Sequence, residues 1–460
     1  MKHKLLLLLL LLPVVAFAKP SGYKFTLQID GNKDSMMVLG YYYAQHIMVF
    51  DTAYNNGHGR FSFSGDHDMP PGLYYFSNAK GRFVDFVVYH EKLNFKFHTD
   101  DRDWTRNMTV TGSKENTVFY NFHRATSTIY DEIEAAKGTM DSAEYVNYRR
   151  NQYHRIDTIR MQTIEQHPAA MLSKMMTATK DPLPPPDTLS QNDRYFWFMH
   201  HYFDNFPIDD DFIIRTPKAV FYQRVTDYVD KHMHGLPPDK ICPLLDSLID
   251  RAEPAPEVYR WLVQNITEKY LQSNVMVYDE VYVHLVQRYF ATGKASWYSP
   301  SVIDEQVERA TKWERILVGR VAPELILFDT LHRPASLHHM PGNYTLLLFW
   351  SPTCGHCRDI IPAVYKVFDR VADSLNITAF AILTEPDETT IGKWKEFLAN
   401  HNMTNPRWIN LNGAEANVDW REVYDITTTP QIFLVENKEH KFIAKKLNAD
   451  LFEQICKQLK

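Results

Sequence analysis

Cysteine is scarce in this chain, and an excess of basic residues is absent. The 460 residues contain four cysteines, too few for a scaffold held together by disulfides. The formal net charge is −6 with both signs intermixed, which disfavours nucleic-acid binding because that function requires a basic patch. After Val15 no apolar run approaches the roughly 20 residues of a membrane-spanning helix, so we expect no membrane span in the mature chain.

Metal-ligand patterns are also lacking. Cys354 and Cys357 are separated by two residues, but a four-cysteine zinc site needs a second pair, and Cys242 and Cys456 each stand alone. No histidine pair with zinc-finger spacing follows the motif. We therefore expect neither a metal nor a cofactor, while a zinc half-site and two unrelated buried thiols remain the alternatives to redox chemistry for this pair.

The N-terminus has the composition of a secretory signal peptide. Lys2 and Lys4 precede an apolar run, and Ala16-Phe17-Ala18 is a small-x-small cleavage pattern. We predict cleavage after Ala18; a retained signal anchor is the alternative. The first cysteine is Cys242, so no cysteine follows the cleavage point to carry a lipid anchor. These features predict a periplasmic or secreted protein, in a compartment where disulfides persist.

The length and the changing periodicity predict several domains. Apolar and polar residues alternate from Tyr23 to Ile29, and short strands separated by turns continue to residue 112, typical of an antiparallel β-sandwich. Helical spacing then replaces this alternation, interrupted by a proline-rich loop at Asp181–Pro186. We predict a signal peptide at 1–18, a β-sandwich domain at 19–112, an α-helical domain at 113–316 and an α/β domain at 317–460.

The paired cysteines lie where a predicted strand meets a predicted helix. The apolar run Leu346–Trp350 precedes Cys354, which would stand at the amino end of the helix. Unpaired N–H groups and the helix dipole favour an anion there, and therefore a thiolate. Cys357 lies one turn further on the same face, so the two sulfurs can close a disulfide. Pro362 falls inside the helix and should kink it.

Taken together, these residues resemble the active-site signature of the thioredoxin superfamily. The signature comprises Trp350, Cys354-Gly355-His356-Cys357 and Pro362, and Thr429-Pro430 before an apolar strand resembles the cis-proline loop. The segment 318–325 is similar to the start of TlpA/ResA-like envelope thioredoxins, to which small β domains are often joined. The resemblance implies a multidomain chain whose residues 317–460 adopt an α/β thioredoxin fold.

The resemblance also implies a function, that of a thiol–disulfide oxidoreductase acting on protein disulfides. Cys354 would attack the substrate and Cys357 would resolve the mixed disulfide, while Thr429 and Pro430 would shape the substrate groove. The implied partners are proteins with disulfides or thiols and an unidentified envelope redox partner. The alternative, from a different class, is a non-catalytic envelope binding or scaffold protein that carries a thioredoxin-like module.

Three further expectations concern the chemistry of the pair. We predict that the Thr429–Pro430 bond is cis, and that Cys354 is the more exposed sulfur with the lower pKa. His356 lies between the cysteines, as in the Cys-Gly-His-Cys motif of protein disulfide isomerase, where a partly cationic imidazole would stabilise the thiolate of Cys354.

Two positions depart from the superfamily pattern. In thioredoxin a buried acid lies six residues before the first cysteine, where this chain has Leu348. ResA-like proteins have a glutamate three residues after the second cysteine, where this chain has Ile360. The usual proton acceptor for the second thiol is therefore missing from both places.

Overall fold

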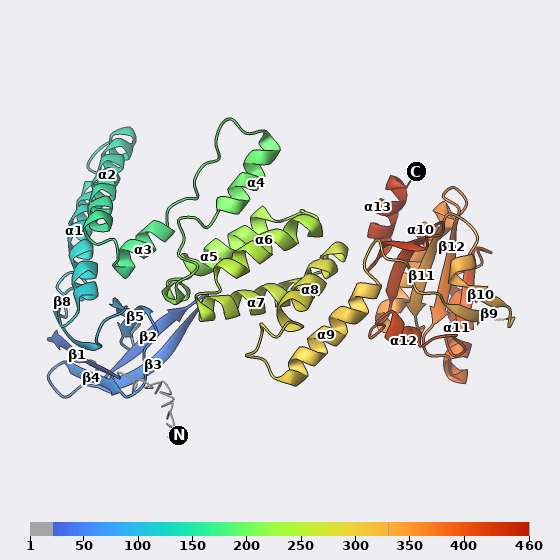
Figure 1. Cartoon of the computed structure of the whole chain (residues 1–460), viewed down its shortest axis with the longest axis horizontal. Coiled ribbons are helices and arrows are strands. Elements are labelled where there is room, and N and C mark those ends of the chain that lie inside the picture. The colour runs from blue at the N-terminus through green and yellow to red at the C-terminus, as the bar shows by residue number, and fades with distance from the viewer. Residues whose placement is uncertain (1–21, 330, 460) are drawn as a thin grey trace, which may run out of the picture. The chain divides into compact units, whose positions relative to one another are not determined.

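The computed structural model describes residues 22–329 and 331–459, so the predicted signal peptide at 1–18 lies outside the described residues. The chain is a multidomain protein of mixed helices and sheets that begins with a sheet domain (Figure 1). It divides into two compact units: residues up to His234 with Asp250–Tyr259, and Gly235–Ile249 with the residues from Arg260 onward. The predicted boundaries at 112 and 316 divide the chain differently and stay predictions. Within the described residues, no helix is both long and apolar enough to cross a membrane.

The N-terminal strands form two four-stranded sheets, with orders β4-β1-β7-β8 and β3-β2-β5-β6 among the described residues. Aromatic side chains fill the space between the sheets: the Phe25 and Phe86 rings lie 5.5 Å apart, and Phe86 lies 5.1 Å from Phe97. The strands are β1 (Tyr23–Asp30), β2 (Met36–Tyr43), β3 (His46–Tyr54), β4 (Arg60–Gly65), β5 (Gly72–Ser77), β6 (Phe83–Val88), β7 (Asn94–Asp100) and β8 (Thr109–Thr111).

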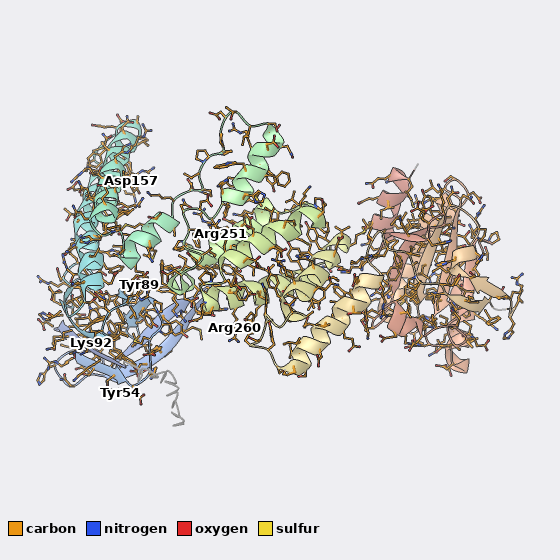
Figure 2. All side chains as sticks on the ribbon, in the orientation of Figure 1. Tyr54, Tyr89, Lys92, Asp157, Arg251 and Arg260 are labelled. Atoms are coloured by element: carbon orange, nitrogen blue, oxygen red, sulfur yellow. The ribbon has the colours of Figure 1, made fainter. Side chains whose placement is uncertain are left out.

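This sandwich departs from the predicted antiparallel arrangement at one pair of strands. β1 and β7 are parallel, with Phe25 opposite Phe95. Parallel neighbours need a connection longer than a hairpin, and the long excursion of the chain from β2 to β6 supplies it. Strand β3 lies at the edge of its sheet and keeps apolar side chains in solvent, since Ile47 is 68% exposed and Tyr54 is 74% exposed. Figure 2 labels Tyr54 in this sheet domain.

A carboxyl group is held in the sheet that contains β2 and β6. Asp85 of β6 accepts a hydrogen bond of 3.0 Å from the Tyr42 hydroxyl. Burial raises the pKa of Asp85 to about 6, and the hydrogen bond from Tyr42 opposes the rise without cancelling it. Because burial disfavours the carboxylate, this group titrates close to neutral pH.

Helices occupy most of residues 114–315. Ser113 caps the first of them by accepting a hydrogen bond from the Asn116 N–H, and the predicted proline-rich loop follows α3. The elements are α1 (Lys114–Ala136), α2 (Ser142–Gln166), α3 (Met171–Ala178), α4 (Gln191–His201), η1 (Asp211–Arg215), α5 (Phe221–Thr226), η2 (Asp227–His232), α6 (Pro238–Arg251), α7 (Pro256–Leu271), η3 (Met276–Tyr278), α8 (Asp279–Leu285), η4 (Val286–Phe290) and α9 (Pro300–Arg315).

The last part of the chain alternates strands and helices. Its described strands form one sheet of order β10-β9-β13-β12-β11-β14-β15, in which β11 pairs with β12 in parallel and with β14 in antiparallel. The elements are β9 (Ile326–Asp329), β10 (Pro334–Ser336), η5 (Leu337–His339), β11 (Tyr344–Trp350), α10 (Gly355–Val371), β12 (Ile377–Leu383), α11 (Glu388–Asn400), β13 (Trp408–Asn412), α12 (Trp420–Val423), β14 (Gln431–Glu436), β15 (Lys441–Ala444) and α13 (Ala449–Gln458).

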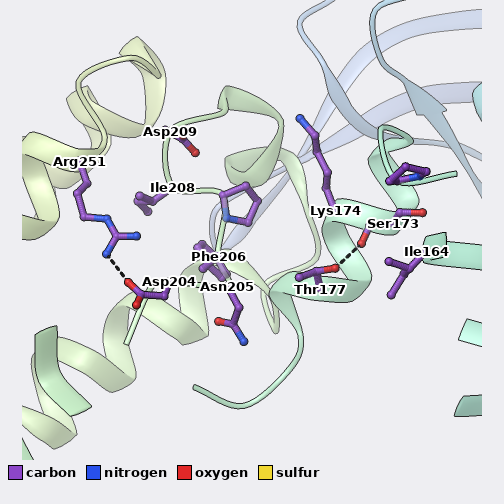
Figure 3. Close-up of a pocket in the computed structure, with 12 residues that line it drawn as sticks. Ile164, Ser173, Lys174, Thr177, Asp204, Asn205, Phe206, Ile208, Asp209 and Arg251 are labelled. Carbon is purple, nitrogen blue, oxygen red and sulfur yellow. Dashed lines mark hydrogen bonds and ion pairs between the residues drawn. The ribbon is translucent and has the colours of Figure 1, made fainter. Parts of the chain in front are cut away.

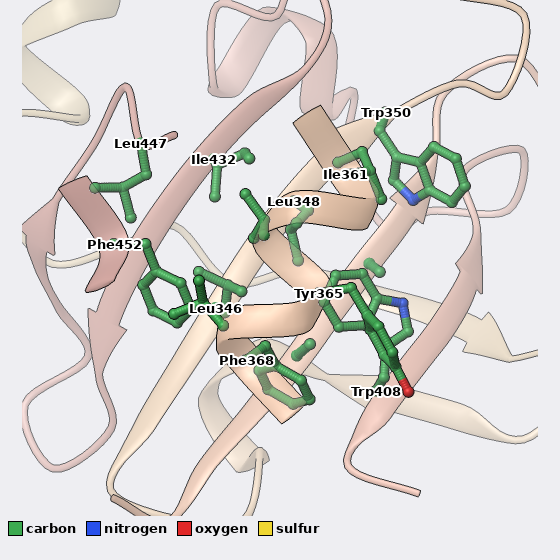
Figure 4. Packing of buried hydrophobic residues seen from close by; sticks show 14 of the residues in the cluster. Leu346, Leu348, Trp350, Ile361, Tyr365, Phe368, Trp408, Ile432, Leu447 and Phe452 are labelled. Carbon is green, nitrogen blue, oxygen red and sulfur yellow. The ribbon is translucent and has the colours of Figure 1, made fainter. Parts of the chain in front are cut away.

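The central strand β11 is covered on both faces. Leu346, Leu348 and Trp350 belong to the same buried cluster as Ile361 and Phe368 of α10 (Figure 4). The alternate residues of β11 pack into a second cluster on the other face of the sheet. A strand buried on both faces has a continuous apolar sequence, and this core fixes the point at which the chain leaves β11 and enters α10.

Candidate active site

The two cysteines of the motif lie at the junction of β11 and α10. Cys354 is the N-cap residue of α10, and Cys357 lies in its first turn. Cys354 is partly exposed, whereas Cys357 is completely buried. The predicted difference in exposure is therefore confirmed. Pro362 lies inside α10, as the sequence predicted.

The environment of Cys354 favours its thiolate. Partial burial by itself would raise the pKa of this thiol. Hydrogen bonds that involve the Thr429 side chain, the backbone and thiol of Cys357, and the His356 backbone outweigh burial, so the pKa of Cys354 lies below its ordinary value. A thiolate is the form that attacks disulfides, so Cys354 is the residue of the pair whose environment favours the reactive form.

Cys357 has the opposite character. Burial is the main cause that raises the pKa of its thiol to about 12, although a backbone hydrogen bond involving Ser351 opposes the rise. At neutral pH this sulfur is protonated in the reduced protein. The predicted order of the two pKa values is confirmed, and it gives the two sulfurs of one motif unequal reactivity.

The loop before β14 contacts the exposed sulfur. The Cys354 thiol donates a hydrogen bond of 3.2 Å to the carbonyl oxygen of Thr429. The Thr429–Pro430 bond is cis, which confirms the prediction from sequence. Sheet register brings the loop here, because Gln431, the residue after Pro430, pairs with Phe349 near the end of β11. Residues about 75 positions apart in the chain therefore meet at one sulfur.

Trp350 and His356 occupy contrasting positions. Trp350 is fully buried, and its ring lies 5.1 Å from that of Phe397, so it belongs to the core beneath the motif. Its indole N–H has no hydrogen-bond partner among the described residues. His356 is exposed in the first turn of α10. The electrostatic role predicted for its imidazole stays a prediction.

A carboxylate that the sequence analysis did not identify lies beside the motif. Glu385 accepts hydrogen bonds from the hydroxyls of Ser351 at 3.0 Å and Thr353 at 2.8 Å. These two residues form the turn between β11 and Cys354. Glu385 follows β12, whose Leu383 pairs with Trp350. The only sequence signal was a glutamate directly after a strand that neighbours β11, because the pairing that brings it to the turn is long-range.

The cysteines outside the motif and possible metal ligands were predicted to play no part in the site. Among residues 22–329 and 331–459, no group of three or more His, Cys, Asp or Glu side chains is arranged to hold a metal ion. Cys242 lies on α6, and burial is the main cause that raises the pKa of its thiol to about 12. Cys456 is buried in α13. Neither of these cysteines shares the features of Cys354.

A pocket of about 610 Å³ lies in the first compact unit. Arg251 and Lys174 approach it from opposite sides (Figure 3). Arg251 forms an ion pair of 3.2 Å with Asp204, and Lys174 forms one of 2.9 Å with Asp210. Both cations are already neutralised by carboxylates, and the pocket lining contains no thiol. The pocket therefore shares no chemistry with the cysteine pair.

Different parts of the chain are similar to different proteins. Residues 23–119 match a family described as a domain of unknown function (DUF4369), and residues 126–313 match a second family described in the same words (DUF5106). The chain is 30% identical over 115 residues to the thiol-disulfide oxidoreductase YkuV of Bacillus subtilis (strain 168), which covers 24% of this chain and 78% of that protein.

Two further proteins are similar to parts of the chain. The chain is 26% identical over 121 residues to the thioredoxin-like protein YneN of Bacillus subtilis (strain 168), which covers 26% of this chain and 66% of that protein. The crystal structure of a thioredoxin-like protein from Bacteroides caccae ATCC 43185 superposes with a TM-score of 0.49 at 19% identity. That superposition covers 61% of this chain and 98% of the other.

Proposed function

The chain belongs to the thioredoxin-like thiol–disulfide oxidoreductases, and we propose that Cys354 and Cys357 are the thiols with which it exchanges disulfides. The observation that carries this proposal is the unequal state of the two sulfurs. Cys354 is accessible at a helix N-terminus with a lowered pKa, and Cys357 is buried with a raised pKa. A nucleophile and a resolving thiol need this difference.

The reaction follows from the positions of the two sulfurs. The Cys354 thiolate attacks one sulfur of the substrate disulfide; a Cys354–substrate bond forms, the substrate disulfide breaks, and the departing thiolate takes up a proton. Cys357 then loses its proton and attacks the sulfur of Cys354, which releases the second substrate thiol. The substrate gains two electrons, and the protein is left with a Cys354–Cys357 disulfide. With all steps reversed, the oxidised protein oxidises a dithiol.

Thr429 and Pro430 form the proposed substrate groove. The Thr429 carbonyl already accepts a hydrogen bond from Cys354, so a backbone strand laid along this loop would bring a substrate cysteine to the same place. Trp350 and Pro362 support the motif from the core and from within the helix. Glu385 holds the turn before Cys354 through two hydroxyls and is the residue that we add to the site.

We extend the proposal to the whole chain. Residues 317–460 would form a thioredoxin module of the TlpA/ResA type, joined to a helical middle domain and an N-terminal β domain. The sequence of residues 1–18 supports export and therefore a periplasmic or secreted location. The substrates would be proteins with disulfides or thiols, and an envelope redox partner would restore the initial state of Cys354 and Cys357.

The experiment is reduction of insulin by dithiothreitol in the presence of the full-length protein. We expect the wild type to accelerate precipitation of insulin chains at least about tenfold, and Cys354→Ser to abolish the acceleration. Cys242→Ser is the matched control, because this thiol lies on α6 outside the site, and it should behave as the wild type. A wild type that leaves the rate of dithiothreitol alone unchanged would refute the enzymatic proposal and favour a binding or scaffold protein.

A further inference from the structure

A buried group of charges links the helices to the loop that follows β15. The Lys445 ammonium lies 2.6 Å from one carboxylate oxygen of Asp279, and the Lys446 ammonium lies 2.7 Å from the other. Asp279 is 1% exposed and Lys445 2% exposed. Burial lowers the pKa of Lys445, and the charge of Asp279 opposes that effect. A single carboxylate in a dry environment thus holds two cations from consecutive residues.

The backbone of this loop is also constrained. Lys446 has φ of 55°, in the left-handed region that is costly for a residue other than glycine. Its ammonium donates a second hydrogen bond, of 3.1 Å, to the carbonyl oxygen of Ser273. The next residue, Leu447, donates its N–H to the carbonyl oxygen of Ile432 at 3.2 Å. Since Ile432 lies two residues after Pro430, the charged loop lies against the strand that begins at the proposed substrate groove.

The segment Ser273–Tyr278, which ends in the short helix η3 (Met276–Tyr278), lies beside the same core as the cysteine helix. Met276 packs against the buried cluster that contains Ile432 and Leu447, and Cys354 also packs against it. Val275, the residue before Met276, is 45% exposed. An apolar side chain is therefore partly exposed on a segment that Asp279 and Ser273 attach to the loop after β15.

We propose that the segment Ser273–Tyr278 is a second wall of the substrate groove, which contacts the polypeptide flanking the reactive disulfide, and that Asp279 is the residue that positions it. This inference rests on the proposed function of Cys354. Its occupant is a protein substrate, since Lys446 bonds the segment and the next residue, Leu447, bonds Ile432 two residues after Pro430, whereas a small disulfide at Cys354 would not extend to the segment. Buried ion pairs define geometry more than they add stability, which suits a positioning role.

The wall is tested in the full-length protein with two probes, insulin and the small disulfide 5,5′-dithiobis(2-nitrobenzoate). Val275→Asp changes an exposed residue, so the fold should survive. We expect kcat/KM for insulin to fall about tenfold relative to kcat/KM for the small disulfide, mainly through KM. Val418→Asp, at a residue of comparable exposure (36%), is the matched control and should leave this ratio at the wild-type value.

The ion pair between Lys446 and Asp279 is tested with Lys446→Met. This variant leaves Asp279 and Lys445 as a balanced pair and should therefore fold even if Asp279→Asn does not. We expect this variant to lower the same ratio by a similar factor. An unchanged ratio in both Val275→Asp and Lys446→Met would overturn the inference and leave the proposed function intact. A wild type that reacts with neither probe would instead overturn the proposed function, and the inference with it.

Discussion

The sulfur of Cys354 lies 3.2 Å from the carbonyl oxygen of Thr429, so the reactive thiol and the loop that would carry substrate are already in contact. A substrate cysteine that bonds to Cys354 is thereby brought next to a backbone acceptor. Of the two sulfurs, only that of Cys354 belongs to a partly exposed residue, because Cys357 is completely buried.

The first prediction concerns trapping of mixed disulfides. Cys357→Ser should accumulate mixed disulfides with other proteins, since Cys354 still attacks and no thiol resolves the product. Cys354→Ser should accumulate almost none, because the remaining thiol is buried. Both variants should stay folded, since so small a disulfide ring restrains little of the unfolded chain. Non-reducing gels separate the outcomes, and equal trapping in both variants would show that the roles are wrongly assigned.

The second prediction concerns the pH dependence of alkylation. Only the thiolate reacts with iodoacetamide, so the rate at Cys354 should reach half its maximum below the pH of about 8.5 expected for an ordinary cysteine. The pKa of Cys357 is about 12, so its rate should still be rising at the highest accessible pH. Mass spectrometry of the two labelled peptides measures both profiles. A midpoint for Cys354 at or above that of an unfolded peptide would contradict the structure.

The third prediction concerns His356 and the redox potential. His356 lies between the two cysteines in the sequence, and positive charge on its imidazole would stabilise the Cys354 thiolate and hence the reduced form. We expect a potential between those of thioredoxin and protein disulfide isomerase, about −270 and −180 mV. His356→Pro should shift the value towards thioredoxin. Equilibration with glutathione gives the number, and a wild-type value like that of thioredoxin, unaltered in the variant, would exclude a role for the imidazole.

The fourth prediction concerns Glu385. Glu385→Ala removes the acceptor of the Ser351 and Thr353 hydroxyls, so the turn before Cys354 should lose its fixed conformation. We expect a loss of about 1 kcal/mol in unfolding free energy and a several-fold fall in the rate of insulin reduction. Glu439→Ala is the control, since Glu439 bonds to Lys441 away from this turn. A rate that is unchanged while stability falls would restrict Glu385 to a structural role.

The fifth prediction concerns stability in the N-terminal sheets. The pKa of Asp85 is about 6 in the folded state, above its ordinary value, so folding favours the protonated form. The stabilisation is complete below the unfolded pKa, and it is lost as the pH rises through about 6. Asp85→Asn should therefore raise the Tm of this part of the chain at pH 8 more than at pH 4. Thermal scans at the two pH values test the difference, and equal shifts would contradict it.

Local pattern explains what could be predicted from the sequence. The apolar run Leu346–Trp350, the two spaced cysteines and Pro362 all lie in one short segment of the sequence. The structure has a strand, a turn and a helix there. Strand β3 has no alternating pattern from which its pairing could be predicted, because it is an edge strand and several of its apolar residues remain exposed. The parallel pairing of β1 and β7 likewise joins residues with no local signal between them.

The contacts around the site depend on distant residues. Glu385 reaches the motif only through the register of β11 and β12. Asp279 and Lys446 are 167 positions apart, and nothing in either segment indicates the other. A single sequence identifies the cysteines, because their chemistry requires a fixed short spacing. It does not identify the side chains that hold them in place, because many residue types in many segments can serve that purpose.

Because Cys354 is the N-cap of α10, the redox behaviour of the cysteine pair is linked to the thermal stability of the chain. The charge of its thiolate is favoured by the helix end, and that charge disappears when the sulfur enters a disulfide. Folding and oxidation are then two sides of one thermodynamic cycle. The difference in unfolding free energy between the reduced and the oxidised chain equals the change that folding makes in the free energy of oxidising the cysteine pair, and the helix end contributes to that change. Calorimetry of the two forms would therefore measure the effect of folding on the pair without any redox couple.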